Sequence, residues 1–398
     1  MSNGKKILIV TPSLRIGGGA ERIAVQLGNS LRRKGYNVIL LSFYPGGPTY
    51  DWDGEHICLG YKEGKNVLLD SFEILFTARK IRDICRERDI DVAISFLTRM
   101  NVQTLLSKSL FGNHVKMVVS ERNNPQILDK KTKRLMRWLY PKADNVVALS
   151  KGVEHILKQD LSLNNTTCIH NIQNIDKFDR LSKKDVRKDH KVIFDDDFLF
   201  VTIGRLTEQK AQWSLLRCFK KVTLAHEDSK LIVLGSGVLN SKLNELTKKM
   251  GIEDKVFFLG NVDNVFPYLK QSDCFVFTSL WEGFGNVLTE ALSQNLPVIS
   301  TDCVAGPREI ICPELEIDAE IDYPYYGKYG ILTKPFKHHM FFKTIEEMPL
   351  SEEELMFAEI MIKIKEEPSL RENYSIGYKR ANEFNVDRLI KEWESVIG

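Results

Sequence analysis

Two basic residues, Arg205 and Lys210, lie on a loop that follows an apolar segment over residues 198–204. The run V-T-I-G-R-L-T-E-Q-K-A is typical of a strand end that leads into a helix, and open α/β sheets bind ligands at that edge. Two fixed cations there can bind a diphosphate and neutralise the charge that develops when it departs, in place of a metal ion. Taken alone, such a pair is better explained as two solvated loop charges.

Two carboxylates separated by seven residues, Glu282 and Glu290, form a second candidate site. Glu282 follows the apolar segment 274–280, and residues 283–286 would begin a helix that carries Glu290 about two turns inside. The unpaired N–H groups at such a helix start suit a phosphate, and a ligand that touches both carboxylates must be elongated. The alternative is that Glu290 lies on the helix surface and the glycines only make a turn.

A third candidate is the run of glycines at 17–19, between the apolar segment 5–13 and a stretch with helical periodicity. Glycine lets the backbone approach a ligand closely, and a helix N-terminus carries a partial positive charge. Many strand-to-helix turns contain glycine only to make the bend, so the run favours an anion site and a plain turn about equally.

The elements that would position these residues alternate along the chain, which predicts an α/β fold of parallel sheets covered on both faces. The expected strands are 5–13, 37–43, 92–97, 116–120 and 145–150, then 198–206, 230–237, 256–260, 274–280 and 297–301. A polar segment over residues 176–197 separates the two series. We therefore predict two doubly wound domains, 1–190 and 191–380, with a helix at about 381–398 that packs back onto the first.

Charge is unevenly distributed over the 398 residues. Residues 1–190 contain 32 Lys or Arg against 20 Asp or Glu, whereas the remainder contains 24 against 33. The seven cysteines form no C-x-x-C pair, which indicates reduced thiols. The first residues show no leader pattern, and no stretch approaches the length of a spanning helix, so we expect a cytoplasmic protein.

The segment 129–142, D-K-K-T-K-R-L-M-R-W-L-Y-P-K, interleaves six basic residues with apolar ones. Such a basic helix could lie on the cytoplasmic face of an anionic membrane. The alternative is that Leu135, Trp138 and Leu139 pack inward while the cations are solvated. Nucleic acid is not an expected partner, because no nucleic-acid motif is present and the second half is acidic.

The motifs G-R-L-T-E-Q-K at 204–210 and E-G-F-G-N-V-L-T-E at 282–290 resemble those of glycosyltransferase family 4, whose hallmark is two glutamates separated by seven residues. The likeness covers nearly the whole chain, since G-G-G-A-E-R, N-V-V-A-L-S, L-G-S-G and G-N-V follow in the family's order. The run D-C-x-x-G-P-R-E-I at 302–310 is shared with members that extend lipid-linked oligosaccharides, N-glycan precursors and capsular or O-antigen repeats.

The resemblance implies the GT-B fold, with two Rossmann-like domains facing each other across a cleft, and a retaining enzyme. The expected reaction moves a hexose or N-acetylhexosamine from a nucleotide sugar, UDP-linked by expectation, to a glycan acceptor on a polyprenyl-diphosphate carrier.

The resemblance also assigns roles to individual residues. Glu282 would be catalytic and contact the hydroxyls of the transferred sugar, while Glu290 would contact the ribose. The residues expected to bind the nucleotide sugar are Gly18, Arg205, Lys210, Asn261, Val262, Gly283, Phe284, Gly285, Asn286, Val287 and Glu290. Gly18 would approach the phosphates from the N-terminal domain, and Asn261 and Val262 would meet the nucleobase.

Two positions depart from the family's pattern. Many relatives have a His near the acceptor, at the end of a late strand of the N-terminal domain. Here the stretch is V-V-S-E-R-N-N-P, and we expect Glu121 to act as a second catalytic residue that orients the acceptor hydroxyl or the sugar. Ala211 replaces the usual Gly or Asn after the lysine, which indicates a modest change beside the phosphate loop.

No metal and no cofactor are expected. The D-W-D run at 51–53 would hold a metal in another glycosyltransferase fold, but here it lies in a loop rich in Gly and Pro. A nucleotide-sugar 2-epimerase or hydrolase of the same fold remains an alternative, as does a non-catalytic protein that binds a glycan or nucleotide. The intact pairs Arg205/Lys210 and Glu282/Glu290 argue against both.

Overall fold

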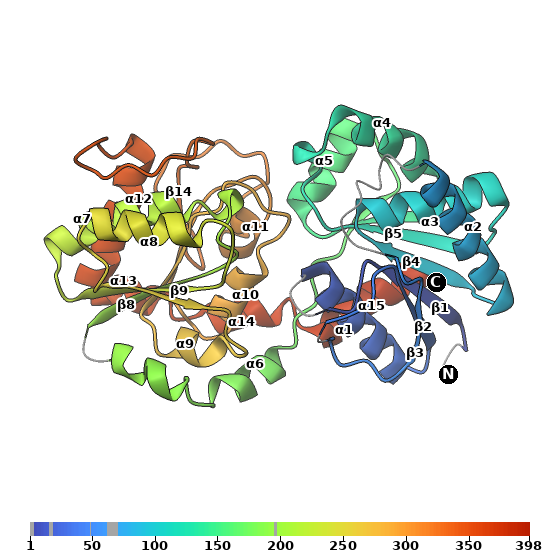
Figure 1. Cartoon of the computed structure of the whole chain (residues 1–398), viewed down its shortest axis with the longest axis horizontal. Helices are drawn as coiled ribbons and strands as arrows, with labels where there is room; N and C mark the ends of the chain where they lie inside the picture. Colours follow the sequence, from blue (N-terminus) through green and yellow to red (C-terminus); the bar gives the residue numbers. More distant parts are fainter. Residues whose placement is uncertain (1–3, 16–18, 48, 62–70, 195–196) are drawn as a thin grey trace. The chain divides into compact units, whose positions relative to one another are not determined.

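The computed structural model describes residues 4–15, 19–47, 49–61, 71–194 and 197–398 (Figure 1). Two compact units divide the chain: the first ends at Gln173 and includes Val386–Gly398, and the second is Asn174–Asn385. Each unit contains a seven-stranded sheet with helices on both faces. This confirms the predicted α/β class with two doubly wound sheets.

The first unit has the strand order β3-β2-β1-β4-β5-β6-β7, with every pairing parallel. Its strands are β1 (Lys6–Thr11), β2 (Asn37–Ser42), β3 (Glu55–Cys58), β4 (Val92–Phe96), β5 (Lys116–Glu121), β6 (Asn145–Ala148) and β7 (Thr166–Cys168). Its helices are α1 (Gly19–Arg33), α2 (Ser71–Glu87), α3 (Thr98–Phe111), α4 (Lys130–Leu139), α5 (Lys151–Leu161) and α15 (Val386–Ile397), with the 3₁₀ turns η1 (Pro125–Ile127) and η2 (Tyr140–Lys142). The order reverses between β1 and β4, which is the topological switch point of this sheet.

Helix α15 contributes an apolar stripe to the core of the first unit. Its buried residues recur at the spacing of one helix face: Val386, Leu389, Ile390, Trp393, Val396 and Ile397. The Trp393 ring stacks on Phe96 at the end of β4, with ring centroids 6.0 Å apart. In Figure 1, α15 and α1 lie on one face of the sheet and α2 and α3 on the other.

The second unit has the order β10-β9-β8-β11-β12-β14-β13, with the switch point between β8 and β11. Its strands are β8 (Phe198–Ile203), β9 (Ser229–Leu234), β10 (Val256–Gly260), β11 (Cys274–Phe277), β12 (Val298–Thr301), β13 (Tyr325–Tyr326) and β14 (Ile331–Thr333). Its helices are α6 (Ile175–Ser182), α7 (Gln212–Ala225), α8 (Asn240–Lys249), α9 (Phe266–Lys270), α10 (Asn286–Leu292), α11 (Pro307–Ile311), α12 (Glu352–Glu366), α13 (Pro368–Tyr374) and α14 (Gly377–Asn382), with η3 (Lys188–Ile193) and η4 (Glu208–Lys210). All pairings are parallel except the short edge hairpin of β13 with β14.

The segment predicted to be a polar linker is part of the second unit, which begins at Asn174 rather than after residue 190. Two of its rings pack on α9: the Phe178 ring stacks on Phe266 with centroids 4.4 Å apart, and His190 Nδ1 lies 2.7 Å from the Tyr268 hydroxyl. The charged residues between them hide this pattern in the sequence.

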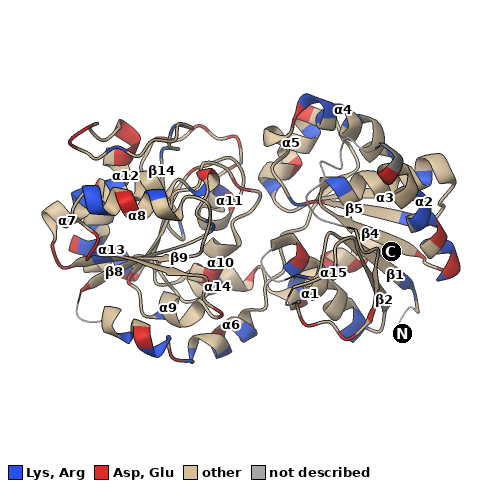
Figure 2. Cartoon of the chain, in the orientation of Figure 1, with Lys and Arg blue, Asp and Glu red and all other residues tan. Residues whose placement is uncertain are grey.

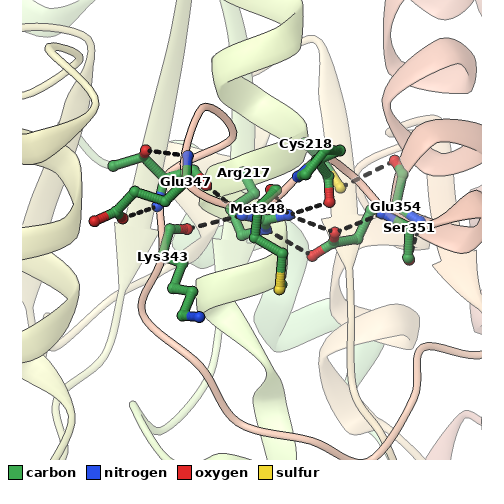
Figure 3. A network of polar contacts seen from close by, with 9 residues as sticks. Arg217, Cys218, Lys343, Glu347, Met348, Ser351 and Glu354 are labelled. Atoms are coloured by element: carbon green, nitrogen blue, oxygen red, sulfur yellow. Dashed lines mark hydrogen bonds and ion pairs between the residues drawn. The ribbon is translucent and has the colours of Figure 1, made fainter.

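Arg217 is the centre of a buried polar network in the second unit (Figure 3). It lies on α7 with 0% exposure, and its Nε and Nη2 donate to the two carboxylate oxygens of Glu354 on α12, both at 3.1 Å. The remaining N–H groups donate to four backbone carbonyls of the loop before α12: Lys343, Thr344, Met348 and Pro349. One guanidinium thus joins α7, α12 and this loop, with all its donors used.

Replacing Arg217 with Met is expected to lower the free energy of unfolding by about 3 kcal/mol, because the change leaves Glu354 buried without its cation and four carbonyls without donors. Chemical denaturation followed by circular dichroism measures the effect. The double variant Arg217→Met/Glu354→Met is the matched control, and should recover part of the loss. Equal stability of Arg217→Met and the wild type would show that the network contributes nothing.

Candidate active site

The two motifs with the strongest chemical signal meet at the switch point of the second sheet. Lys210 ends the loop after β8, Glu282 lies within the loop after β11, and these strands are neighbours. Lys210 Nζ lies 2.5 Å from Glu282 Oε1, and both side chains are largely buried. The structure therefore brings together a cation and a carboxylate that are 72 residues apart, at the position where doubly wound sheets bind ligands.

Lys210 is held on several sides. Its ammonium lies 4.9 Å from the centroid of the Phe277 ring, and its backbone carbonyl accepts a hydrogen bond from the Thr278 hydroxyl at 2.9 Å. The following residue, Ala211, has a φ of 47°, a left-handed backbone conformation that Gly or Asn adopts more readily than Ala. The ammonium position is thus fixed by both strands of the switch point.

Arg205 lies on the same loop with its side chain exposed. Its Nη2 is 3.4 Å from Gln209 Oε1, and Gln209 Nε2 donates to the Trp281 carbonyl at 2.8 Å. The Leu280 N–H donates to the Gln209 carbonyl at 2.8 Å. Gln209 therefore ties the loop of Arg205 and Lys210 to the loop of Glu282, a role that the sequence did not reveal.

Two glycines keep the backbone of these loops close together. A Cβ atom on Gly235, after β9, would lie 2.1 Å from the Gly204 carbonyl oxygen, and φ of Gly235 is 130°. A Cβ atom on Gly306 would lie 2.0 Å from the Phe284 carbonyl oxygen, with φ at 96°. Neither position tolerates a side chain, so the glycines of L-G-S-G and of the 302–310 run are required by packing.

The loop after β12 forms a further wall beside Glu282. The Glu282 N–H lies 3.4 Å from the Val304 carbonyl oxygen. Asp302 anchors this loop: its carboxylate lies 2.6 Å from Arg308 Nη2 and accepts from the Tyr323 hydroxyl at 2.7 Å. Burial, followed by the bond to Asp302, raises the pKa of Tyr323. The 302–310 run was recognised in the sequence, but no role was predicted for Asp302, Arg308 or Tyr323.

Helix α10 begins directly after the glycine pair of the Glu282 loop. Gly285 precedes it with a φ of 92°, and Asn286 and Val287 are its first residues. Phe284 is buried, and Glu290 is buried on the fifth residue of the helix, about 6 Å along its axis from Asn286. Glu290 therefore lies about one turn into the helix, where two turns were predicted.

Asn261 and Val262 follow β10, two strands from β8 on the side away from Glu282. Gly260 has a φ of 65°, and its carbonyl accepts from the Gly235 N–H at 2.8 Å. Asn261 is exposed and Val262 is half-buried, at the same carboxyl edge as Arg205. The predicted nucleobase site and the predicted diphosphate site thus share one sheet edge.

Glu121 has different surroundings from those expected of a residue that touches substrate. It ends β5 with 0% exposure, and its carboxylate accepts from the Thr98 hydroxyl at 3.0 Å, the Tyr140 hydroxyl at 2.7 Å and the Asn123 N–H at 3.2 Å. Burial raises the pKa of Glu121, and these hydrogen bonds oppose the rise. Such an arrangement favours a residue that positions the loop after β5. The catalytic role stays a prediction that these contacts do not support.

Gly18, the predicted phosphate contact of the N-terminal unit, lies outside the described residues. Gly19 is the first residue of α1, which follows β1 directly along the chain. The D-W-D loop lies elsewhere in this unit, where Asp53 pairs with Arg32 on α1.

Two family descriptions match successive parts of the chain: Glycosyltransferase Family 4 at residues 17–177 and Glycosyl transferases group 1 at residues 183–355. An uncharacterized glycosyltransferase of Methanocaldococcus jannaschii is 43% identical over 375 residues, which cover 91% of this chain and 92% of that protein. The chain belongs to glycosyltransferase family 4. It is a transferase enzyme, as the Arg205/Lys210 and Glu282/Glu290 motifs predicted.

Other relatives of this family 4 glycosyltransferase carry more specific names. The 4-alpha-N-acetylgalactosaminyltransferase of Campylobacter jejuni that acts on N-acetylgalactosamine-N,N'-diacetylbacillosaminyl-diphospho-undecaprenol is 32% identical over 258 residues, 63% of this chain and 68% of that protein. Among solved structures, Anabaena HepE in complex with UDP has a TM-score of 0.74 at 17% identity, covering 98% of each chain. A glycosyltransferase from Rickettsia africae has a TM-score of 0.75 at 17% identity, covering 99% of this chain and 98% of its own. These likenesses confirm the GT-B fold.

Proposed function

We propose that this enzyme moves a hexose or N-acetylhexosamine from a UDP-sugar to a glycan on a polyprenyl-diphosphate carrier, with retention of anomeric configuration. The observation that carries the proposal is the ion pair of Lys210 and Glu282 at the switch point, with Arg205 on the same loop. The cation can bind the diphosphate of a donor, and the carboxylate can bind the sugar attached to that diphosphate. The pair therefore suits the point where these two parts of one donor meet.

The proposed reaction breaks the bond between the anomeric carbon and the diphosphate oxygen. Arg205 and Lys210 stabilise the negative charge on the departing diphosphate, so no carboxylic acid has to protonate it. Glu282 binds the sugar hydroxyls and stabilises the positive charge on the sugar. The acceptor hydroxyl attacks from the face that the diphosphate left, and its proton passes to a departing phosphate oxygen. The products are the glycoside and UDP.

The sheet edge has a length that suits this donor. The ends of β10 and β11 are three strand spacings apart, about 14 Å at the usual separation of strands. We propose that the base lies at Asn261 and Val262, the diphosphate at Arg205 and Lys210, and the sugar beside Glu282. The amides of residues 283–286 and the buried Glu290 are the proposed contacts to the rest of the nucleotide.

Named relatives support the choice of donor and acceptor. HepE was crystallised with UDP and glucose. Two transferases of Campylobacter jejuni are named for adding N-acetylgalactosamine to glycans on diphospho-undecaprenol or PP-undecaprenol. The names of these two transferases support the proposal that this enzyme also adds a sugar to a lipid-linked glycan.

A donor panel tests the proposal. The purified protein is incubated with UDP- and GDP-linked hexoses and N-acetylhexosamines, with and without a polyprenyl-diphosphate-linked glycan, and the products are identified by mass spectrometry. We expect a UDP-sugar to yield UDP and an acceptor longer by one sugar. Formation of an epimerised donor would support the alternative hypothesis of an epimerase. Hydrolysis of the donor at a rate that the acceptor does not change would support a hydrolase. No reaction and no nucleotide affinity would indicate a binding protein.

Transfer is expected to continue at a rate within about two-fold of the untreated rate in excess EDTA, because two fixed cations supply the charge that a metal ion would otherwise supply. The measurement is the initial rate with and without the chelator. Loss of transfer that magnesium or manganese restores would contradict the proposed metal independence.

We also propose that α4 contacts an anionic membrane surface. Figure 2 shows basic residues along this helix. Trp138 is 51% exposed with the Lys142 ammonium 4.0 Å from its ring centroid, whereas Met136 and Leu139 are buried. The helix thus has an inward apolar side and an outward side that combines cations with an aromatic ring, as peripheral membrane helices do. No helix within the described residues is long and apolar enough to cross a membrane.

The double variant Lys131→Gln/Arg134→Gln is expected to bind vesicles of an anionic phospholipid roughly 30-fold more weakly, since each cation near such a surface contributes about 1 kcal/mol. Co-sedimentation at physiological salt measures the binding. Lys248→Gln/Lys270→Gln removes the same charge from exposed positions of the acidic unit and should bind as the wild type does. If both double variants bind equally, α4 is not the contact.

A further inference from the structure

Arg122, the residue after β5, is a buried cation whose hydrogen-bonding capacity is only partly used. It is 7% exposed, and its Nη1 donates to Asn171 Oδ1 at 2.7 Å. Its Nε and Nη2 are buried and have no hydrogen-bond partner among the residues that the structure describes. Nε and Nη2 form the side of the guanidinium that matches two oxygens of a phosphate or carboxylate.

The neighbouring carboxylate does not pair with this cation. Glu121 precedes Arg122, but its oxygens accept from Thr98, Tyr140 and the Asn123 N–H. No ion pair links Arg122 to a carboxylate within the described part of the chain. Burial lowers the pKa of Arg122 to about 9, although electrostatic interactions with Cys168 and Glu121 oppose the fall, so the guanidinium keeps its charge at neutral pH. An unpaired buried cation is costly to the folded state unless an anion neutralises it.

Two aromatic rings fix the guanidinium in place. Its Cζ lies 5.1 Å from the centroid of the Phe96 ring and 5.5 Å from that of the Trp393 ring. Trp393 is 0% exposed, and its Nε1 also lacks a hydrogen-bond partner among the described residues. The groups without a hydrogen-bond partner, Arg122 Nε and Nη2 and Trp393 Nε1, are therefore all donors. An anion that only accepts hydrogen bonds would satisfy them, whereas another donor would not.

The location also suits a ligand. β5 is separated from the switch point between β1 and β4 by one strand, and Arg122 follows its carboxyl end. We propose that Arg122, with the Trp393 indole N–H, forms an oxyanion site in the first unit that binds a phosphate group of a substrate. The identity of that substrate rests on the proposed function, since the donor and the carrier-linked acceptor each contain a diphosphate.

Inorganic pyrophosphate is the first probe, measured by calorimetry on the full chain at constant ionic strength. The test is carried out in the variant Lys210→Met, in which the second unit is expected to bind pyrophosphate more weakly. The affinity that remains then reports binding to the first unit. In this background, Arg122→Met is expected to weaken pyrophosphate binding at least 10-fold, and Trp393→Phe about 3-fold. Arg86→Met, on the exposed side of α2 in the same unit, is the matched control and should not alter it.

Thermal unfolding separates binding from a purely structural role. In buffer without multivalent anions, Arg122→Met should melt at or above the wild-type temperature, because an unpaired buried charge has been removed; pyrophosphate should then raise only the wild-type value. A lower melting temperature with unchanged pyrophosphate affinity would overturn the proposal. If Arg122→Met does not fold, unchanged binding by Trp393→Phe would overturn it.

The source of the phosphate is identified by two further ligands. A loss of affinity for UDP in Arg122→Met indicates the donor, and a loss for a short-chain polyprenyl diphosphate indicates the acceptor; either outcome supports the site, and no loss for both contradicts it. Wild-type protein that binds pyrophosphate through Arg122 but transfers no sugar would refute the proposed function and leave the oxyanion site standing.

Discussion

Replacing Glu282 with Gln is expected to lower kcat roughly 100- to 1,000-fold while the affinity for UDP stays nearly unchanged. The Glu282 carboxylate is buried and lies 2.5 Å from the Lys210 ammonium. The amide keeps the size of the side chain but removes the charge that would stabilise a cationic sugar, whereas Lys210 remains available to the diphosphate. Initial rates at saturating donor give kcat, and calorimetry gives the dissociation constant of UDP.

Glu208→Gln is the matched control, because Glu208 lies on the exposed turn two residues before Lys210. It should transfer sugar at the wild-type rate. Wild-type kcat in Glu282→Gln would remove Glu282 from the active site. A parallel loss of UDP affinity would instead show that Glu282 acts by holding Lys210.

Replacing Lys210 with Met is expected to lower kcat/KM about 1,000-fold and to weaken UDP binding about 10- to 100-fold, since a charge-assisted contact to the diphosphate is lost. This combination differs from that of Glu282→Gln, in which only turnover falls. The Lys210 side chain links the loop after β8 to the loop after β11, so the melting temperature must be measured alongside the kinetics.

Lys248→Met removes a lysine from the exposed side of α8 in the same unit and should leave both constants unchanged. Unchanged UDP affinity in folded Lys210→Met would contradict the assignment of the diphosphate to this loop. Activity that falls only in proportion to lost folded protein would indicate a structural role.

Much of the fold could be predicted because strands buried on both faces appear in the sequence as continuous apolar runs. β4, for example, is buried at all five positions and matches the run V-A-I-S-F. The edge hairpin of β13 and β14 was missed, since a two-residue strand leaves no periodic signal. The domain boundary was placed too late, because Phe178 and His190 are buried by α9 although charged residues surround them in the chain.

Some residues of the candidate site could be predicted from the sequence and others could not. Arg205, Lys210 and Glu282 stand in contiguous motifs, so their loops could be identified from the sequence. The roles of Gln209 and Asp302 could not, because they depend on contacts to residues distant in the chain, such as Trp281 and Tyr323. Burial is equally invisible in the sequence. Glu121 was expected at the substrate because it stands about where many relatives have a His, and its partners Thr98 and Tyr140 enclose it.

The proposed reaction is same-face transfer of a sugar from a UDP-linked donor, assisted by the Arg205 and Lys210 cations. The most direct test is the proton NMR spectrum of the purified product, formed from an α-linked UDP-sugar of the gluco or galacto series and a lipid-linked glycan. We expect a small coupling constant at the new anomeric proton, which reports an α linkage and hence retention. A large coupling constant, which reports a β linkage, would contradict it.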